Sequence, residues 1–131
     1  MRLFDGMTVE NGELSISKVG VSELKAQYGT PLYVYDENML VNQCRTFINN
    51  FKSSKFNTEV LYASKAFSCL EVLRIASREG LGVDVVSLGE IHTAYKAGYD
   101  MKRAYFHGNN QTREELQYAL EVGVGTIVID N

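Results

Sequence analysis

Short apolar runs alternate with helix-like stretches through the middle and the end of the chain. Four runs have the length and character of buried strands, at residues 59–63, 82–86, 104–107 and 126–130. The stretches between them place apolar side chains at helical spacing, most clearly over residues 68–79. Strand centres recur about every two dozen residues, the length of one strand, one helix and two short loops. This pattern predicts serial βα units and therefore a parallel sheet.

Helix-capping residues delimit the predicted helices. Three serine or threonine residues precede a glutamate by three positions, which is the spacing of a capping box. Glycines follow each helical stretch, where a glycine commonly ends a helix. The capping pairs are Ser68 with Glu71, Ser87 with Glu90, and Thr112 with Glu115, and the glycines are Gly80, Gly98 and Gly123. The runs Gly80-Leu-Gly82 and Gly123-Val-Gly125 precede strands, so they indicate helix-to-strand turns and not a phosphate loop.

The first part of the chain has a different pattern. Residues 12–17 alternate like an edge strand, and residues 22–28 predict a short helix that ends at Gly29. Residues 32–35 are a weaker strand candidate, and Asp36 is expected to cap the next helix. The expected inward side chains of that helix are Leu40, Cys44, Phe47, Ile48 and Phe51. We place a domain boundary at the Thr30–Pro31 junction, which separates residues 1–30 from residues 31–131.

Serial βα units form either a doubly wound sheet or a (β/α)8 barrel. A barrel of this kind takes about 250 residues, and this chain has 131, with an apolar strand at its end. We therefore predict an α/β fold that corresponds to about the first half of a TIM-type (β/α)8 barrel.

Composition narrows the function classes. The 13 basic and 16 acidic residues give a net charge of −3, which argues against binding to nucleic acid or to a membrane surface. No apolar run is long enough to span a membrane, and no secretory signal opens the chain. Two cysteines without a CxxC pair, together with two histidines, give no support for a metal site. We expect a cytoplasmic, globular protein.

Candidate chemistry gathers where the predicted strands end. In parallel α/β folds, functional side chains lie at the carboxyl ends of the strands. The polar residues there are Lys65, Asp84, Ser87, Glu90, His107, Asn109, Asn110 and Asp130. Ser87 and Glu90 are explained by helix capping. Asn109 and Asn110 are explained first by a turn, and the alternative is that they orient a group at this edge.

Lys65 is the most specific of these candidates. Strand alternation places Leu61, Ala63 and Lys65 on one side, so the amine is expected to point toward the sheet interior. Partial burial lowers the pKa of a lysine amine and suits it to Schiff-base chemistry. The alternative is a solvated lysine in a βα loop, which is the commoner situation for a single lysine.

Asp84 and His107 each have two interpretations. A carboxylate among the valines of a strand is costly unless it is paired. Asp84 is therefore either a partner of Lys65 or of a bound cofactor, or one half of a buried salt bridge. His107 is either an acid, base or ring-stacking group, or a cap on a backbone carbonyl.

Residues 62–67 (YASKAF) closely resemble the cofactor-lysine motif of the fold-type III pyridoxal-phosphate decarboxylases, whose barrel is alanine-racemase-like. Three further stretches agree in order and spacing, at residues 80–90, 106–110 and 115–125. Together they resemble the N-terminal part of the diaminopimelate decarboxylases, and residues 106–110 favour these over ornithine, arginine or carboxynorspermidine decarboxylases. Two departures from the family pattern are Leu88 before Gly89 and Gln111 after the asparagines.

This resemblance implies that Lys65 binds pyridoxal 5'-phosphate as a Schiff base. Asp84 lies near that lysine, and His107 is a further cofactor contact, although the histidine that stacks on the ring in this family comes from a later strand. The implied reaction is decarboxylation of meso-2,6-diaminopimelate to L-lysine and CO2, the last step of lysine biosynthesis. Family members are homodimers, and residues 1–30 correspond to a segment of their β-domain.

The resemblance also implies what the 131 residues lack. The phosphate-binding loop, the partner of the pyridine nitrogen and the substrate-binding arginines belong to later parts of family members. The chain alone is therefore expected to be an inactive N-terminal fragment that self-associates. Two alternatives remain: the same scaffold as a non-catalytic pyridoxal-phosphate carrier, and an unrelated doubly wound domain that binds a small metabolite.

Overall fold

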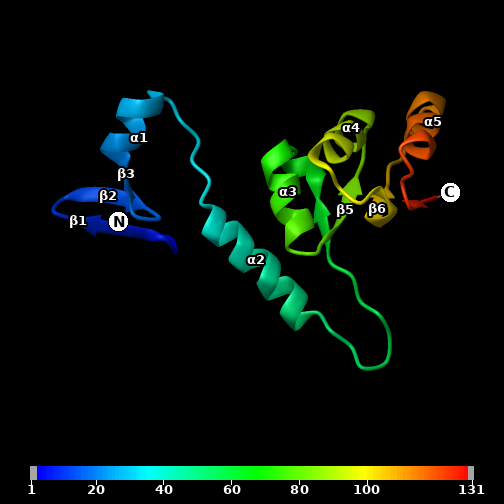
Figure 1. Ribbon diagram of the computed structural model, residues 1–131, viewed down its shortest axis with the longest axis horizontal. Coiled ribbons are helices and arrows are strands. Elements are labelled where there is room, and N and C mark those ends of the chain that lie inside the picture. The colour runs from blue at the N-terminus through cyan, green and yellow to red at the C-terminus, as the bar shows by residue number, and fades with distance from the viewer. Residues whose placement is uncertain (1–2, 130–131) are drawn as a thin grey trace. The chain divides into compact units, whose positions relative to one another are not determined.

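A computed structural model of the protein describes residues 3–129, and the chain divides between residues 43 and 44 into two compact units (Figure 1). The first unit contains strands β1 (Met7–Glu10), β2 (Glu13–Ile16) and β3 (Val19–Gly20) and helix α1 (Val21–Tyr28). The strands form an antiparallel sheet in the order β1-β2-β3. The predicted strand within residues 12–17 is confirmed as β2. It is the central strand, however, so its expected position at the edge of a sheet is wrong.

Two tight turns explain the extra pairing of β2. Asn11 and Gly12 connect β1 to β2, and Ser17 and Lys18 connect β2 to β3. All four residues have positive φ, as two-residue hairpin turns require. Asparagine and glycine are common at such positions, whereas serine and lysine are not. The β2–β3 hairpin therefore carries no turn signal in the sequence.

Helix α2 (Glu37–Asn50) begins after Asp36, as predicted. The Asp36 carboxylate accepts hydrogen bonds from the backbone N–H groups of Asn38 (2.9 Å) and Met39 (3.3 Å). The Ser17 hydroxyl also donates to it at 2.6 Å, and this bond most strongly lowers the pKa of Asp36. The preceding residues 32–35 are irregular, so the weaker strand candidate is wrong.

In the last turns of α2, fewer side chains pack inward than the sequence predicts. Cys44 and Ile48 pack against the core of the second unit. Phe47 and Phe51 are exposed, so their expected inward placement is wrong.

The second unit is a parallel sheet of four strands in sequence order: β4 (Leu61–Ala63), β5 (Gly82–Val85), β6 (Ala104–Phe106) and β7 (Thr126–Ile127). Helices connect successive strands: α3 (Leu70–Arg78), α4 (Leu88–Ala97) and α5 (Arg113–Glu121). Two 3-10 turns complete the unit, η1 (Ser64–Ala66) and η2 (Met101–Arg103). The predicted βα repeat and partial barrel are confirmed. None of the helices within residues 3–129 is long and apolar enough to cross a membrane.

The helices cover one face of this sheet. Val83, Val85 and Phe106 are fully buried there, in one cluster with Leu73 of α3 and Ile91 of α4. Alternate residues point to the opposite face. On that face Ala63 is exposed and Asp84 and Tyr105 are half-buried, so the sheet has one packed side and one accessible side.

The predicted glycine turns are confirmed. Gly80, Gly98 and Gly123 all have φ between 80° and 85°, the left-handed conformation that ends a helix. Gly125 is required for a different reason: the Lys102 backbone lies so close that a Cβ at position 125 would overlap the Lys102 carbonyl. Gly82 has a similar restriction, with the Arg103 carbonyl 2.9 Å from an added Cβ.

The predicted caps differ in outcome. Thr112 and Glu115 form a complete capping box at α5. Ser87 caps α4 by accepting from the Glu90 N–H at 3.3 Å. The Ser68 cap is wrong: α3 begins after Cys69, and no side chain caps it.

Candidate functional site

The three candidate residues lie at the carboxyl edge of the parallel sheet. Lys65 follows β4 within η1, Asp84 is the third residue of β5, and His107 directly follows β6. Ala63 is registered with Asp84, and Val85 with Phe106, so the ends of neighbouring strands stand side by side. Asp130, the remaining candidate, lies outside the described residues.

Lys65 is exposed, and the expected partial burial is wrong. Strand alternation stops at Ala63, because η1 turns the chain immediately after it. The lysine backbone is nevertheless firmly held. The hydroxyl of buried Ser64 donates to the Asp84 carbonyl at 2.9 Å, and the hydroxyl of Tyr62 donates to the Phe67 carbonyl at 2.6 Å.

Asp84 forms no buried salt bridge, so that interpretation is wrong. Its carboxylate has no hydrogen bond or ion pair with any residue in the 3–129 range. The Asp84 side chain is half-buried, and it points to the face of the sheet opposite to that of the fully buried Val83 and Val85. Asp84 therefore presents an uncompensated negative charge on the accessible side of the sheet.

His107 is exposed, and only its backbone is engaged. Its N–H donates to the Val85 carbonyl at 2.9 Å. The imidazole caps no carbonyl among the described residues, so that alternative is wrong. Asn109 and Asn110 are exposed beyond it, and the Gln111 amide donates to the Phe106 carbonyl at 3.4 Å.

Two glutamates fix the loops of this edge. The carboxylate of Glu90 accepts from the Val86 N–H at 2.5 Å. The carboxylate of Glu115 accepts from the Thr112 N–H at 2.8 Å and from the Leu88 N–H at 3.1 Å. These backbone N–H groups lower the pKa of Glu115. The capping spacing predicted the contact with Thr112, but not the bond that ties the start of α5 to the start of α4.

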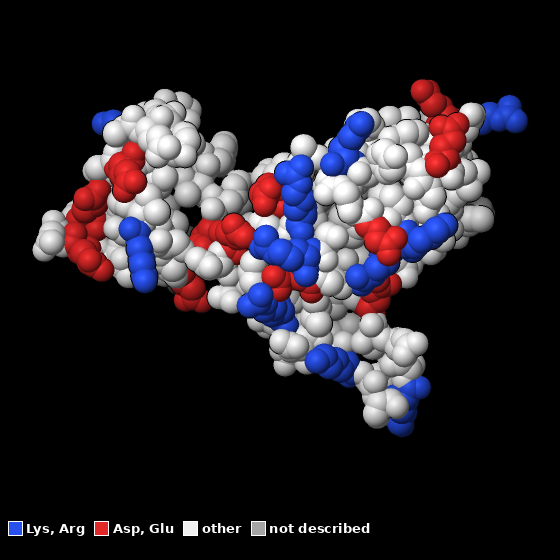
Figure 2. Space-filling view, in the orientation of Figure 1, with Lys and Arg blue, Asp and Glu red and all other residues white. Residues whose placement is uncertain are grey.

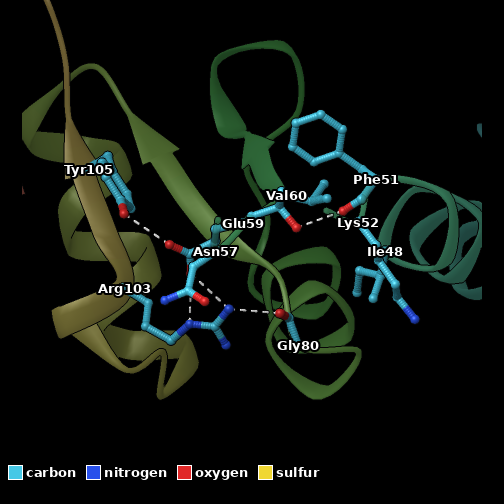
Figure 3. Close-up of a pocket in the computed structure, with 10 residues that line it drawn as sticks. Ile48, Phe51, Lys52, Asn57, Glu59, Val60, Gly80, Arg103 and Tyr105 are labelled. Carbon is cyan, nitrogen blue, oxygen red and sulfur yellow. Dashed lines mark hydrogen bonds and ion pairs between the residues drawn. The ribbon is translucent and has the colours of Figure 1, made fainter. Parts of the chain in front are cut away.

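A pocket of about 490 Å³ lies at the opposite, amino edge of the sheet (Figure 3). The Arg103 guanidinium donates to one carboxylate oxygen of Glu59 at 2.8 and 2.9 Å, and to the Gly80 carbonyl at 2.8 Å. The Tyr105 hydroxyl donates to the other Glu59 oxygen at 2.9 Å, and this bond raises the pKa of Tyr105. Glu59, Arg103 and Tyr105 therefore bind one another, whereas Lys52, which also lines the pocket, donates to the Asn49 side-chain oxygen at 3.4 Å.

Charged side chains of both signs lie on the surface of the second unit. On the face drawn in Figure 2, basic and acidic side chains are interspersed over the second unit. An ion pair between Arg45 and Glu79 at 2.7 Å is one such mixed contact, and it lowers the pKa of Glu79.

Known proteins similar to this chain were found by sequence and by structure. The family model described as pyridoxal-dependent decarboxylase, pyridoxal binding domain, matches residues 37–131. A diaminopimelate decarboxylase of Bacillus methanolicus is 48% identical over 122 residues, which are 93% of this chain and 28% of that protein. The chain thus spans less than a third of that relative.

Solved structures give the same family and fold. A crystal structure of diaminopimelate decarboxylase from M. jannaschii in co-complex with L-lysine has a TM-score of 0.90 and 30% identity, over 97% of this chain and 30% of that one. Lysine/ornithine decarboxylase from Vibrio vulnificus, complexed with putrescine, is 23% identical with a TM-score of 0.74, over 85% of this chain and 30% of that one. The latter similarity concerns the fold alone.

Proposed function

The chain belongs to the pyridoxal-dependent decarboxylases, and from that premise we propose that Lys65 is the residue that binds pyridoxal 5'-phosphate. The observation that carries the proposal is the position of this amine. Lys65 is exposed at the carboxyl edge of the sheet, on a backbone held from both sides by hydrogen bonds. Catalytic groups of (β/α)8 barrels occupy this edge.

The residues present fit the aldehyde end of this cofactor. An exposed lysine amine condenses with an aldehyde, and Asp84 supplies a carboxylate that no described residue neutralises. His107 is exposed nearby on the end of β6 and is available for a further contact. When bound, pyridoxal phosphate accepts the electron pair that remains when the substrate loses CO2.

We further propose that the substrate is meso-2,6-diaminopimelate and that the products are L-lysine and CO2. Relatives at 42–48% identity are diaminopimelate decarboxylases, and one similar structure holds L-lysine. Four strands provide only part of such a barrel, so these 131 residues alone are expected to be inactive. The proposal includes a cytoplasmic homodimer, and it keeps the boundary after residue 30 between the β-domain segment and the barrel.

The test is borohydride reduction of the longest natural protein that contains this sequence, in the presence of pyridoxal phosphate, followed by peptide mapping. A pyridoxyl group on Lys65 is the expected result. Lys65→Ala should abolish the adduct completely, whereas Lys52→Ala, which removes a lysine at the amino edge, should leave it unchanged. An adduct elsewhere, or none, would refute the assignment.

A further inference from the structure

Ser64 is buried in a segment whose neighbours are exposed. Residues 62–67 form an arch that leads from β4 toward α3, and pairing with β5 ends where Ala63 registers with Asp84. Beyond that point Lys65 is exposed, whereas Ser64 has no exposed surface. Since a buried hydroxyl is costly without a partner, the bond that Ser64 makes is a specific feature of this arch.

Two hydrogen bonds hold the arch in place. The Ser64 hydroxyl donates to the Asp84 carbonyl at 2.9 Å, across 20 positions of sequence. The Tyr62 hydroxyl donates to the Phe67 carbonyl at 2.6 Å and so closes the arch on itself. The first bond ties the arch to the neighbouring strand, and the second limits its internal freedom.

The anchor of the first bond is itself fixed. The Val85 carbonyl accepts from the His107 N–H at 2.9 Å, which holds the end of β5 to β6. The next N–H, that of Val86, is held by the Glu90 carboxylate. The Asp84 carbonyl is therefore part of a strand end that is held on both sides. A hydroxyl that donates to this carbonyl is fixed relative to the sheet.

We propose that Ser64 is a positioning residue, which holds the backbone of Lys65 at a fixed place relative to Asp84 so that the lysine amine meets the cofactor aldehyde in one orientation. The inference rests on the proposed function of Lys65 and assigns a role to the residue before it. Ser64 does not contact the reacting atoms; it acts through the lysine that follows.

A matched pair of substitutions tests this role. Ser68 lies four positions further on, and its hydroxyl is also buried but has no hydrogen-bond partner among the described residues. Ser64→Ala and Ser68→Ala therefore each remove one buried hydroxyl from the same part of the chain. Only Ser64→Ala also removes a hydrogen bond. Both variants are to be made in the longest natural protein that contains the sequence.

Hydrogen exchange and circular dichroism are measured on both variants, and thermal denaturation checks that each variant is folded. Hydrogen exchange over residues 63–67, in protein without cofactor, is expected to accelerate roughly fivefold in Ser64→Ala, as for one lost hydrogen bond. The circular dichroism of the lysine-bound cofactor is expected to decrease severalfold in Ser64→Ala, because the chromophore is no longer held in one orientation. Ser68→Ala should behave as the unmodified protein in both measurements.

Equal exchange and equal dichroism in the two variants would overturn the proposal. If Ser64→Ala does not fold, Ser64→Thr carries the test, because it keeps the hydroxyl. A folded Ser64→Thr is expected to retain the dichroism, and its loss would overturn the proposal too. Failure of the proposed function has a different signature: borohydride would then trap no cofactor on Lys65 even in the unmodified protein, while exchange still reports on the bond.

Discussion

The two edges of the β4–β7 sheet use their polar side chains in different ways. At the amino edge, Glu59 binds both Arg103 and Tyr105, so the polar ends of these three side chains all have partners (Figure 3). At the carboxyl edge, Lys65 is exposed and Asp84 has no partner within the described part of the chain. At the amino edge these polar groups bind one another, whereas at the carboxyl edge the side chains of Lys65 and Asp84 have no partner among the described residues.

This difference shows that a pocket alone does not locate the chemistry. The pocket of about 490 Å³ belongs to the amino edge, where residues of a (β/α)8 barrel contribute to stability. The candidate residues occupy the other edge, where the backbone is held while the side chains of Lys65, Asp84 and His107 have no partner within residues 3–129. Substitutions at the two edges should consequently affect different measured quantities.

The largest expected effect on stability comes from Gly125 at the amino edge. A Cβ at this position would overlap the Lys102 carbonyl, and the Gly125 N–H donates to the Met101 carbonyl at 2.8 Å. Gly125→Ala should therefore lower the free energy of unfolding by about 3 kcal/mol or more, as measured by urea denaturation.

Gly89, at the carboxyl edge, is the control for this substitution. An added Cβ there meets no atom within 4 Å, and Gly89 lies in the first turn of α4. Gly89→Ala should raise the free energy of unfolding by about 0.5 kcal/mol. Similar losses from both substitutions would show that the amino edge is not the more tightly built of the two.

A smaller effect is expected from Glu59→Ala, which removes the shared acceptor of the amino edge. The Arg103–Glu59 pair is partly exposed, at 38% and 32% of the two side chains, so solvent weakens it. The free energy of unfolding should fall by about 1 kcal/mol, and borohydride trapping at Lys65 should not change.

Glu71→Ala provides the comparison, since its ion pair with Arg74 is 60% and 50% exposed. It should cost less than about 0.5 kcal/mol in unfolding free energy. Reduced trapping at Lys65 in the Glu59→Ala variant would mean that the two edges are coupled.

The sequence predicted the strands, helices and turns of the β4–β7 sheet better than the exposure and hydrogen bonds of its side chains. Apolar runs and helix-ending glycines such as Gly98 are local signals, so the strands and turns were confirmed. The exposure of Lys65 depends on η1, a three-residue turn that strand alternation cannot anticipate. The partner of Ser64 lies 20 positions away, and a long-range bond of this kind leaves no periodic signal. The predicted Ser68 cap was wrong because the N-cap residue of α3 is Cys69, one residue later than the capping spacing suggested.

Glu115 offers the most selective test, because it fixes the loops of the carboxyl edge without being one of the candidate site residues. Its carboxylate accepts backbone N–H bonds from both Thr112 and Leu88, which hold its pKa below the ordinary 4.5. Glu115→Gln should lower the free energy of unfolding at pH 7 by about 1 kcal/mol. Glu114→Gln, which removes the same charge at the same helix end, should cost less.

The pH dependence of the Glu115 contribution follows from linkage. A carboxyl whose pKa is lower in the folded state stabilises the fold fully above the unfolded value of 4.5. That stabilisation is lost as the pH falls through the lower, folded pKa. The difference between the unmodified protein and Glu115→Gln should therefore be constant near neutral pH and shrink in acid, as followed by urea denaturation at a series of pH values. A difference that stays constant down to strongly acidic pH would mean that the Glu115 charge does not hold the two loops together.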